Sequence, residues 1–285
     1  MGIRFEQDDP SDALPVDLDN LELWGVGNRL LRARLAGVSE YDCRQAELRR
    51  GVLPPFYLGS RTLDALFEEI GPLVDKTAQL RAAPRQTVDV VVDLPDGRQL
   101  RGTVGGLHGE RLVAVSYSKL AAAPRLRAWL CILALTAAHP DKSWEATTVG
   151  RGERGRPRCA TLTPVKPAVA ASVLGQLVEL YDKGLREPLP LPVKTAAEYA
   201  AHRCRGADVD DAQYRARMRW ASSTYPGEDD DAAHGLVWGR LAPFETLLAA
   251  ASRPDEAWGG EPHRFGELAI RLWAPLLDHE KQAAL

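Results

Sequence analysis

The stretch that decides the fold is "RLVAVSYSKL" at residues 111–120. It is short, rich in β-branched and aromatic residues and preceded by a His-Gly turn, which is typical of a β-strand. Two earlier runs, residues 86–94 and 98–107, have the same character, and the Pro-Asp-Gly sequence between them indicates a hairpin. A helix is expected to begin at Pro124, because proline fits the first position of a helix. The sequence therefore predicts three strands followed by a helix.

The segments on either side of these strands extend the pattern. Before them, Ser60 is expected to cap a helix of several turns, which Gly71-Pro72 could kink. After them, residues 124–139 predict a largely buried helix, and residues 143–150 and 158–165 predict two short strands. The predicted class is α+β, with a mixed sheet and the element order αβββαβ. That is the order of the PD-(D/E)xK nuclease core.

Helices flank this core in the sequence on both sides. Before it, Asp19 and Ser39 are expected to cap two helices that stop at Gly37 and Gly51. After it, the pattern predicts helices only, separated by polar loops. These helices cover about residues 167–185, 196–204, 210–222, 244–252 and 262–282.

The length of 285 residues suits one large domain or two modest ones. We predict one compact domain, a fragment of a longer chain, built from three segments. Residues 1–58 are an N-terminal helical segment packed on the core, residues 59–165 are a nuclease-like α/β core without catalytic residues, and residues 166–285 are a C-terminal helical segment.

The third strand lacks the residues that make this core a nuclease. In an active core, strand two supplies an Asp, and strand three supplies an acid and, two residues later, a Lys on the same face. The carboxylates hold Mg²⁺, which activates the attacking water. Here these positions hold Gly105, Ser116 and Ser118, and Lys119 comes one place late. We therefore predict no catalytic residues, and we interpret these three positions as vestigial.

Other acids offer alternative metal sites that we weigh lower. Asp89 and Asp93 could serve a nuclease with relocated acids, although solvated positions on the first hairpin are the simpler interpretation. The acidic residues at 208–211 suit a helix N-cap, and those at 227–231 suit a solvated loop. The histidines are scattered, so no metal site is predicted.

One segment, residues 143–159, is the best candidate for DNA contact. It predicts a hairpin with basic side chains at its tip and Trp144 at its base, where arginines could contact phosphates and an aromatic ring could stack on bases. A solvated surface loop and a subunit contact are the alternatives. The candidate arginines are Arg151, Arg154, Arg156 and Arg158.

The composition is that of an ordinary soluble protein, with 45% hydrophobic and 26% charged residues. The net charge of −3 means that any DNA contact must be local. The first ten residues are acidic, and no apolar run is long enough to span a bilayer, so a cytoplasmic protein is expected. Four separated cysteines indicate reduced thiols. Core packing is expected for Trp24, Trp129, Trp220, Trp238, Trp258 and Trp273.

Three stretches of the chain resemble the C-terminal domain of the RecC family. These are "IRFEQDDPSDALPVDLDNLELWGVGNRLL" at residues 3–31, "LRRGVLPPFYLGSRTLDALFEEIGPL" at residues 48–73 and "LVELYDKGLREPLPLPVKTAAEYA" at residues 177–200. Each stretch alone is a modest motif, but the three occur in the family's order. RecC is the gamma subunit of exodeoxyribonuclease V, the RecBCD helicase and nuclease.

The resemblance implies a role and a set of partners. RecC is a non-catalytic subunit of a complex that processes double-strand DNA ends for recombinational repair. Its C-terminal domain lies at the forking duplex, helps to split the strands and contacts the RecD subunit. RecB and RecD supply the ATP-driven motors and the working nuclease, so no cofactor is expected in this domain, and ATP and Mg²⁺ act in the partner subunits. A protein-interaction module without DNA contact is the remaining alternative.

Overall fold

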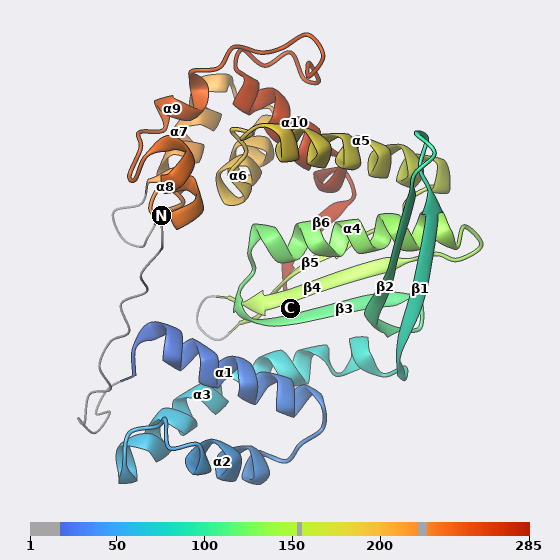
Figure 1. The fold of residues 1–285 in the computed structure, drawn as a ribbon. Helices are drawn as coiled ribbons and strands as arrows, with labels where there is room; N and C mark the ends of the chain where they lie inside the picture. Colours follow the sequence, from blue (N-terminus) through green and yellow to red (C-terminus); the bar gives the residue numbers. More distant parts are fainter. Residues whose placement is uncertain (1–17, 153–155, 222–226) are drawn as a thin grey trace, which may run out of the picture.

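The computed structural model describes residues 18–152, 156–221 and 227–285 (Figure 1). Within these residues no helix is long and apolar enough to cross a membrane. The helices are α1 Asn20–Leu35, α2 Glu40–Arg49, α3 Phe56–Thr77, α4 Ala122–Ala138, α5 Pro167–Arg186, α6 Val193–Arg203, α7 Val209–Trp220, α8 Ala232–Trp238, α9 Glu245–Leu248 and α10 Arg264–Leu277. The strands are β1 Arg85–Asp93, β2 Gln99–His108, β3 Arg111–Lys119, β4 Glu145–Arg151, β5 Arg158–Leu162 and β6 Glu280–Ala284.

The strands form one six-stranded sheet in the order β1-β2-β3-β4-β5-β6. β3 and β4 pair in parallel, with α4 as the crossover, and the other neighbours pair antiparallel. The predicted α+β class, mixed sheet and αβββαβ order are therefore confirmed. The division into segments at residues 58 and 165 stays a prediction.

The strand β6 was missed by the sequence prediction, which continued a helix to residue 282. Glu280, Lys281 and Gln282 favour helices, but α10 ends at Leu277 and these residues pair with β5 instead. The strand also brings Glu280 to Arg125 of α4, where their side chains form a largely buried ion pair with Arg125 Nε 2.7 Å from Glu280 Oε1. Long-range pairing here overrides the local preference of the residues.

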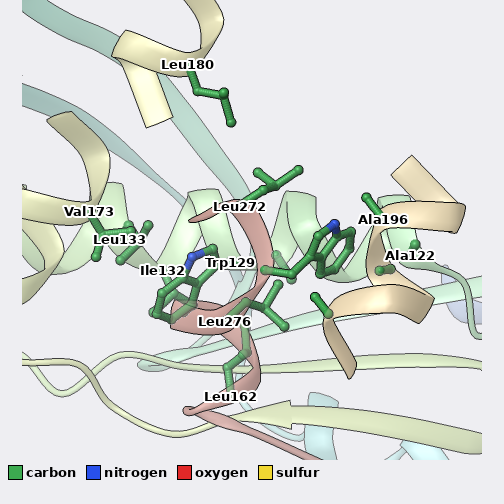
Figure 2. Close-up of a cluster of buried hydrophobic side chains, with 14 of the residues drawn as sticks. Ala122, Trp129, Ile132, Leu133, Leu162, Val173, Leu180, Ala196, Leu272 and Leu276 are labelled. Carbon is green, nitrogen blue, oxygen red and sulfur yellow. The ribbon is translucent and has the colours of Figure 1, made fainter. Parts of the chain in front are cut away.

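Helices cover both faces of the sheet (Figure 1). On one face, α4 packs against the sheet and against α5 and α6, and Trp129, Ile132 and Leu133 of α4 are fully buried (Figure 2). On the other face, α1 and α3 pack on β3 and β4 through a second cluster that includes Leu30 and Ile70. Burying each such side chain contributes about 1.5–3 kcal/mol.

The predicted core role holds for Trp129, Trp220 and Trp273, which are fully buried. It is wrong for two others: Trp24 at the surface of α1 is 38% exposed and Trp258 in a surface loop is 44% exposed. Helical spacing identifies a face of a helix, but it does not show how far a neighbouring element covers that face.

Several predicted helix ends are confirmed. Asp19 and Glu22 form a capping box at α1, and the Ser39 hydroxyl accepts a hydrogen bond from the Asp42 backbone N–H at α2. The cap predicted at Ser60 is wrong, because α3 begins four residues earlier at Phe56 and continues through Pro72.

The C-terminal half contains a buried carboxylate where a solvated loop was expected. Glu228 accepts hydrogen bonds from the backbone N–H groups of Lys194 and Thr195 and from the Thr195 hydroxyl, so it caps α6 from a distant part of the sequence. Asp229 beside it is also buried. The cap predicted near residue 208 is confirmed, because Asp208 accepts from the Asp211 backbone N–H. A carboxylate that caps a distant helix gives no local signal.

A buried ion pair fixes the loop before α10. Arg264 donates through Nε and Nη2 to the two carboxylate oxygens of Glu256, at 2.6 and 2.8 Å, and it also contacts Glu187. Lys183 lies 3.2 Å from Glu256. The loop is further held by the Glu267 carboxylate, which accepts three backbone N–H bonds from residues 258, 259 and 261. These buried contacts hold the loop in a single conformation.

This ion pair predicts acid sensitivity. The hydrogen bond from Arg264 holds the pKa of Glu256 below its ordinary value of 4.5, and that of Glu187 is lowered by Arg253 and Arg264. A lowered folded-state pKa contributes stability that is present above pH 4.5 and is lost as the pH falls through the folded-state pKa. Urea unfolding at pH 7 and at pH 3–4 should therefore show a loss of stability that is smaller in Glu256→Gln. An equal loss in both proteins would contradict this.

Candidate nucleic-acid interface

The second strand leaves the third before it reaches the two serines. β2 pairs with β3 only at Leu107–Leu112 and His108–Arg111. Gly106 has φ +79° and lies at a register shift in the β1–β2 ladder, which marks a bulge. Beyond this point β2 bends away from β3 (Figure 1), and Gly105 pairs with Thr87 of β1 instead. The positions expected to share one metal site are thus on strands that diverge.

The serines at the end of β3 are already engaged within the protein. Trp24 of α1 donates from Nε1 to the Ser118 hydroxyl oxygen over 2.9 Å, and the Ser118 backbone N–H donates to the Ser116 hydroxyl oxygen over 3.1 Å. α1 lies close to β3 here, since a Cβ on Gly27 would come within 2.3 Å of the Tyr117 ring. Among the described residues, no group of three or more His, Cys, Asp or Glu side chains could hold a metal ion.

The two acids considered as relocated ligands lie on the exposed side of β1. Asp89 accepts a hydrogen bond from the Thr103 hydroxyl over 2.8 Å, and Asp93 accepts one from the Gln99 side-chain amide over 2.7 Å. Both are on one face of the strand but four residues apart, which places them about 13 Å from each other. That separation is too large for both carboxylates to bind one metal ion.

Arg151 is the first of the four candidate arginines, and it already forms an ion pair within the protein. Its guanidinium pairs with Glu69 of α3 and lies 4.1 Å from the centre of the Tyr117 ring. Tyr117 also donates its hydroxyl to Glu69, and burial together with this hydrogen bond raises the pKa of Tyr117. Arg151 therefore joins β4 to α3.

Trp144 is a core residue in this structure. Its side chain is 1% exposed and belongs to the cluster under α4, with the His139 ring 6.2 Å away between centroids. The Lys142 ammonium lies over the same ring at 5.3 Å. A ring so placed cannot stack on a base without leaving the core, so we do not keep Trp144 in the interface.

Arg156 and Arg158 are the candidate arginines that remain open to solvent. Both are exposed, and neither forms an ion pair with any residue that the structure describes. Arg154 lies outside the described residues. Arg158 begins β5 opposite Gly150 of β4, which places its side chain at the end of the sheet.

Lys119 joins these two arginines, although the sequence pattern gave it no role. It is exposed, and it ends β3 in register with Arg151 of β4. Since β4 separates β3 from β5, the Cα atoms of Lys119 and Arg158 are about 10 Å apart. We call Lys119, Arg156 and Arg158 the basic rim. No signal in the sequence identified Lys119, because it is the parallel pairing of β3 and β4 that brings it to the same end of the sheet as Arg158.

Comparisons with known proteins give consistent results. A family model described as the RecC C-terminal domain matches residues 1–204. The chain is 44% identical over 272 residues to the RecBCD enzyme subunit RecC of Mycolicibacterium smegmatis, covering 95% of this chain and 24% of that protein. It is 42% identical over 279 residues to the subunit of the same name from Mycobacterium tuberculosis, covering 98% and 25%. The chain thus spans about a quarter of the length of these relatives.

Proposed function

This chain belongs to the RecC C-terminal domain family, and from that premise we propose that it is a non-catalytic part of a RecBCD-type complex that processes DNA ends in double-strand break repair. Its relatives are named as subunits of the RecBCD enzyme. The nuclease and helicase activities, with their ATP and Mg²⁺, then reside in RecB and RecD subunits. Such a complex would act in the cytoplasm, where the bacterial chromosome lies.

The observation that carries the non-catalytic role is the end of β3. Ser116 and Ser118 are neutral, and they are occupied by hydrogen bonds within the protein. β2 leaves β3 at Gly106, so a restored acid at Gly105 would still lie on the diverging hairpin. This arrangement supports a nuclease-like fold that no longer binds the metal needed for hydrolysis.

We therefore expect the isolated protein to show no Mg²⁺- or Mn²⁺-dependent activity. Millimolar Mg²⁺ or Mn²⁺ should leave its thermal unfolding midpoint unchanged and should produce no cleavage of linear DNA. The matched variant Asp89→Asn with Asp93→Asn should behave in the same way as the wild-type protein. Metal-dependent cleavage that this variant loses would establish the rival function, an active nuclease with relocated acids.

The basic rim is the surface that we propose contacts DNA in the assembled complex. Its charges are exposed, whereas the nearby strand residue Arg151 is already paired with Glu69. Arginine and lysine side chains hold phosphates without reading sequence. The rim can position a DNA end, whereas no aromatic wedge accompanies Arg156 and Arg158 within the described residues.

Neutralising the rim should lower the salt dependence of DNA binding. If Arg156 and Arg158 each neutralise one phosphate, replacing both by alanine should reduce the slope of log K against log salt concentration by about 1.8 for duplex DNA. The measurement is binding of the assembled complex to labelled DNA ends at several salt concentrations. Arg186→Ala, an exposed arginine on α5, is the control. A slope that stays at its wild-type value in the double variant would remove the rim from the proposal.

A pure protein-interaction module is the second candidate, because the net charge of −3 offers no general attraction for DNA. Gel-shift measurements with forked DNA separate the two candidates. Binding by the full complex that weakens when the rim is neutralised favours DNA contact. The interaction module is favoured if the rim variant assembles normally with RecB- and RecD-type subunits and the complex binds DNA as tightly as the wild type does.

A further inference from the structure

A groove between α1 and α3 lies outside the proposed DNA contact. Its volume is about 390 Å³. Its lining is mostly aliphatic, and its polar residues all come from α3. The lining residues are Leu18, Leu23, Pro54, Leu58, Arg61, Thr62, Ala65, Leu66 and Glu69.

Two aromatic side chains project into solvent beside this groove. Phe56 is 93% exposed and Tyr57 is 73% exposed, although both begin the helix α3 that forms one wall. Single exposed apolar residues are common, but these two adjacent aromatic residues lie in the sequence between Pro54 and Leu58, which both line the groove. Aromatic side chains that become buried on binding supply much of the binding energy at protein interfaces.

The backbone at Phe56 is held in an unfavourable conformation. Its φ of +57° is rare for a bulky residue. The Pro54-Pro55 sequence fixes the chain before it, and the first turn of α3 comes so close that a Cβ on Gly59 would lie 2.3 Å from the Pro54 carbonyl oxygen. The segment thus keeps Phe56 pointing outward in a conformation that glycine or asparagine would adopt more easily. Strain of this sort concentrates at functional sites.

The charges around the groove indicate what it can bind. Arg61 is exposed and forms no ion pair with any described residue, whereas Glu69 is occupied by Tyr117 and Arg151. One positive charge thus lines an otherwise mostly apolar groove, which suits a single carboxylate. The mostly aliphatic lining, with a single basic residue, is unlike the rows of positive charge that hold a nucleic-acid backbone, and Asp64 on the same helix is already paired with Arg44.

We propose that this groove binds a segment of another subunit that carries an apolar side chain next to a carboxylate. The apolar side chain fills the groove between Leu23 and Leu58, Phe56 and Tyr57 cover it, and Arg61 pairs with the carboxylate. This inference rests on the proposed function only in taking the protein as a subunit of a complex. The groove and the basic rim use different residues, so each can fail without the other.

Photo-crosslinking identifies the occupant directly. Phe56 is replaced by p-benzoylphenylalanine in the full-length protein, which is co-produced with its RecB- and RecD-type subunits, and the crosslinked peptides are sequenced by mass spectrometry. We expect a crosslink to one of those subunits within a few residues of an Asp or Glu. A crosslink to the same chain, to a second copy or to no protein would overturn the proposal. Binding of the subunits only after residues 1–17 are removed would also overturn it, because the chain's own segment would then be the occupant.

Variants at the groove test the assigned contacts. Arg61→Glu and the double variant Phe56→Ala, Tyr57→Ala should each weaken subunit association at least tenfold, while Arg61→Lys should retain most of it. Replacing the crosslinked carboxylate by lysine should restore binding to Arg61→Glu. Phe56→Gly should unfold at the same or a higher temperature than the wild type, which separates loss of binding from loss of folding. Unchanged association in all variants would refute the groove as a docking site, while the salt dependence of DNA binding would still test the rim.

Discussion

Replacing Arg264 with alanine should destabilise the protein by about 3 kcal/mol, the lower end of the cost of breaking a buried ion pair. The Arg264 side chain is 4% exposed and the Glu256 side chain is fully buried, so the substitution leaves a carboxylate in the interior without its two-pronged partner. The value lies at the lower end because Lys183 still contacts Glu256. Chemical denaturation at pH 7 measures the change.

Arg253 provides the matched control for this substitution. It pairs with Glu187, as Arg264 does, but its side chain is half exposed. Arg253→Ala should therefore cost no more than about 1 kcal/mol. The double variant Arg264→Met, Glu256→Gln should recover most of the stability, because it removes both buried charges. If Arg264→Ala and Arg253→Ala cost the same, the buried pair does not hold the loop before α10.

Replacing Gly27 with alanine should cost about 1–3 kcal/mol, because overpacking a closed interface forces neighbouring side chains and backbone to shift. A Cβ at this position would come within 2.3 Å of the Tyr117 ring, and the Tyr117 ring is held by its hydrogen bond to Glu69. α1 must then move away from the end of β3. The fluorescence of Trp24, whose indole bonds Ser118, should change together with the stability.

Gly25 lies two residues earlier on the same helix, and its replacement by alanine is expected to change the stability in the opposite direction. A Cβ there would have its nearest neighbour, a terminal nitrogen of Arg29, at 3.6 Å. Gly25→Ala should therefore stabilise the protein by about 0.5–1 kcal/mol through helix propensity. If the two substitutions change the free energy of unfolding in opposite directions, α1 packs directly against Tyr117. Stabilisation by both would mean that α1 does not press on β3.

The central elements could be predicted from local sequence because several signals agreed. β-branched runs, a Pro-Asp-Gly turn and the apolar stretch before His139 predicted β1, β2, β3 and α4, and each element has those neighbours in the structure. The caps at Asp19 and Ser39 were readable for the same reason, since a cap acts within three residues.

The predictions that were wrong concern features that depend on contacts between residues far apart in the sequence. β6 forms because β5 offers it a partner, and Glu228 is buried because the N-terminus of α6 lies against it. Trp144 was placed at the surface because a tryptophan next to a basic loop resembles a stacking platform, whereas the sheet turns it under α4.

The candidate site was only partly readable from the sequence. The absence of acids on β3 could be seen at once, and so could the arginines of the β4–β5 connection. The bend of β2 had a weak signal in Gly105-Gly106, which could be read as a bulge only with the register of β1 known. Lys119 entered the basic rim through the parallel pairing of β3 with β4, which no local pattern encodes.

The pairing of Arg125 with Glu280 has a consequence for synthesis on the ribosome. The two residues are 155 positions apart, and at roughly 5–20 residues per second Glu280 is made about 8–30 seconds after Arg125. During that interval α4 can pack on β1 to β4, but β5 has an open edge and a guanidinium in the forming core has no carboxylate. We expect the nascent chain to need protection from aggregation at this stage, and release of β6 to complete the fold.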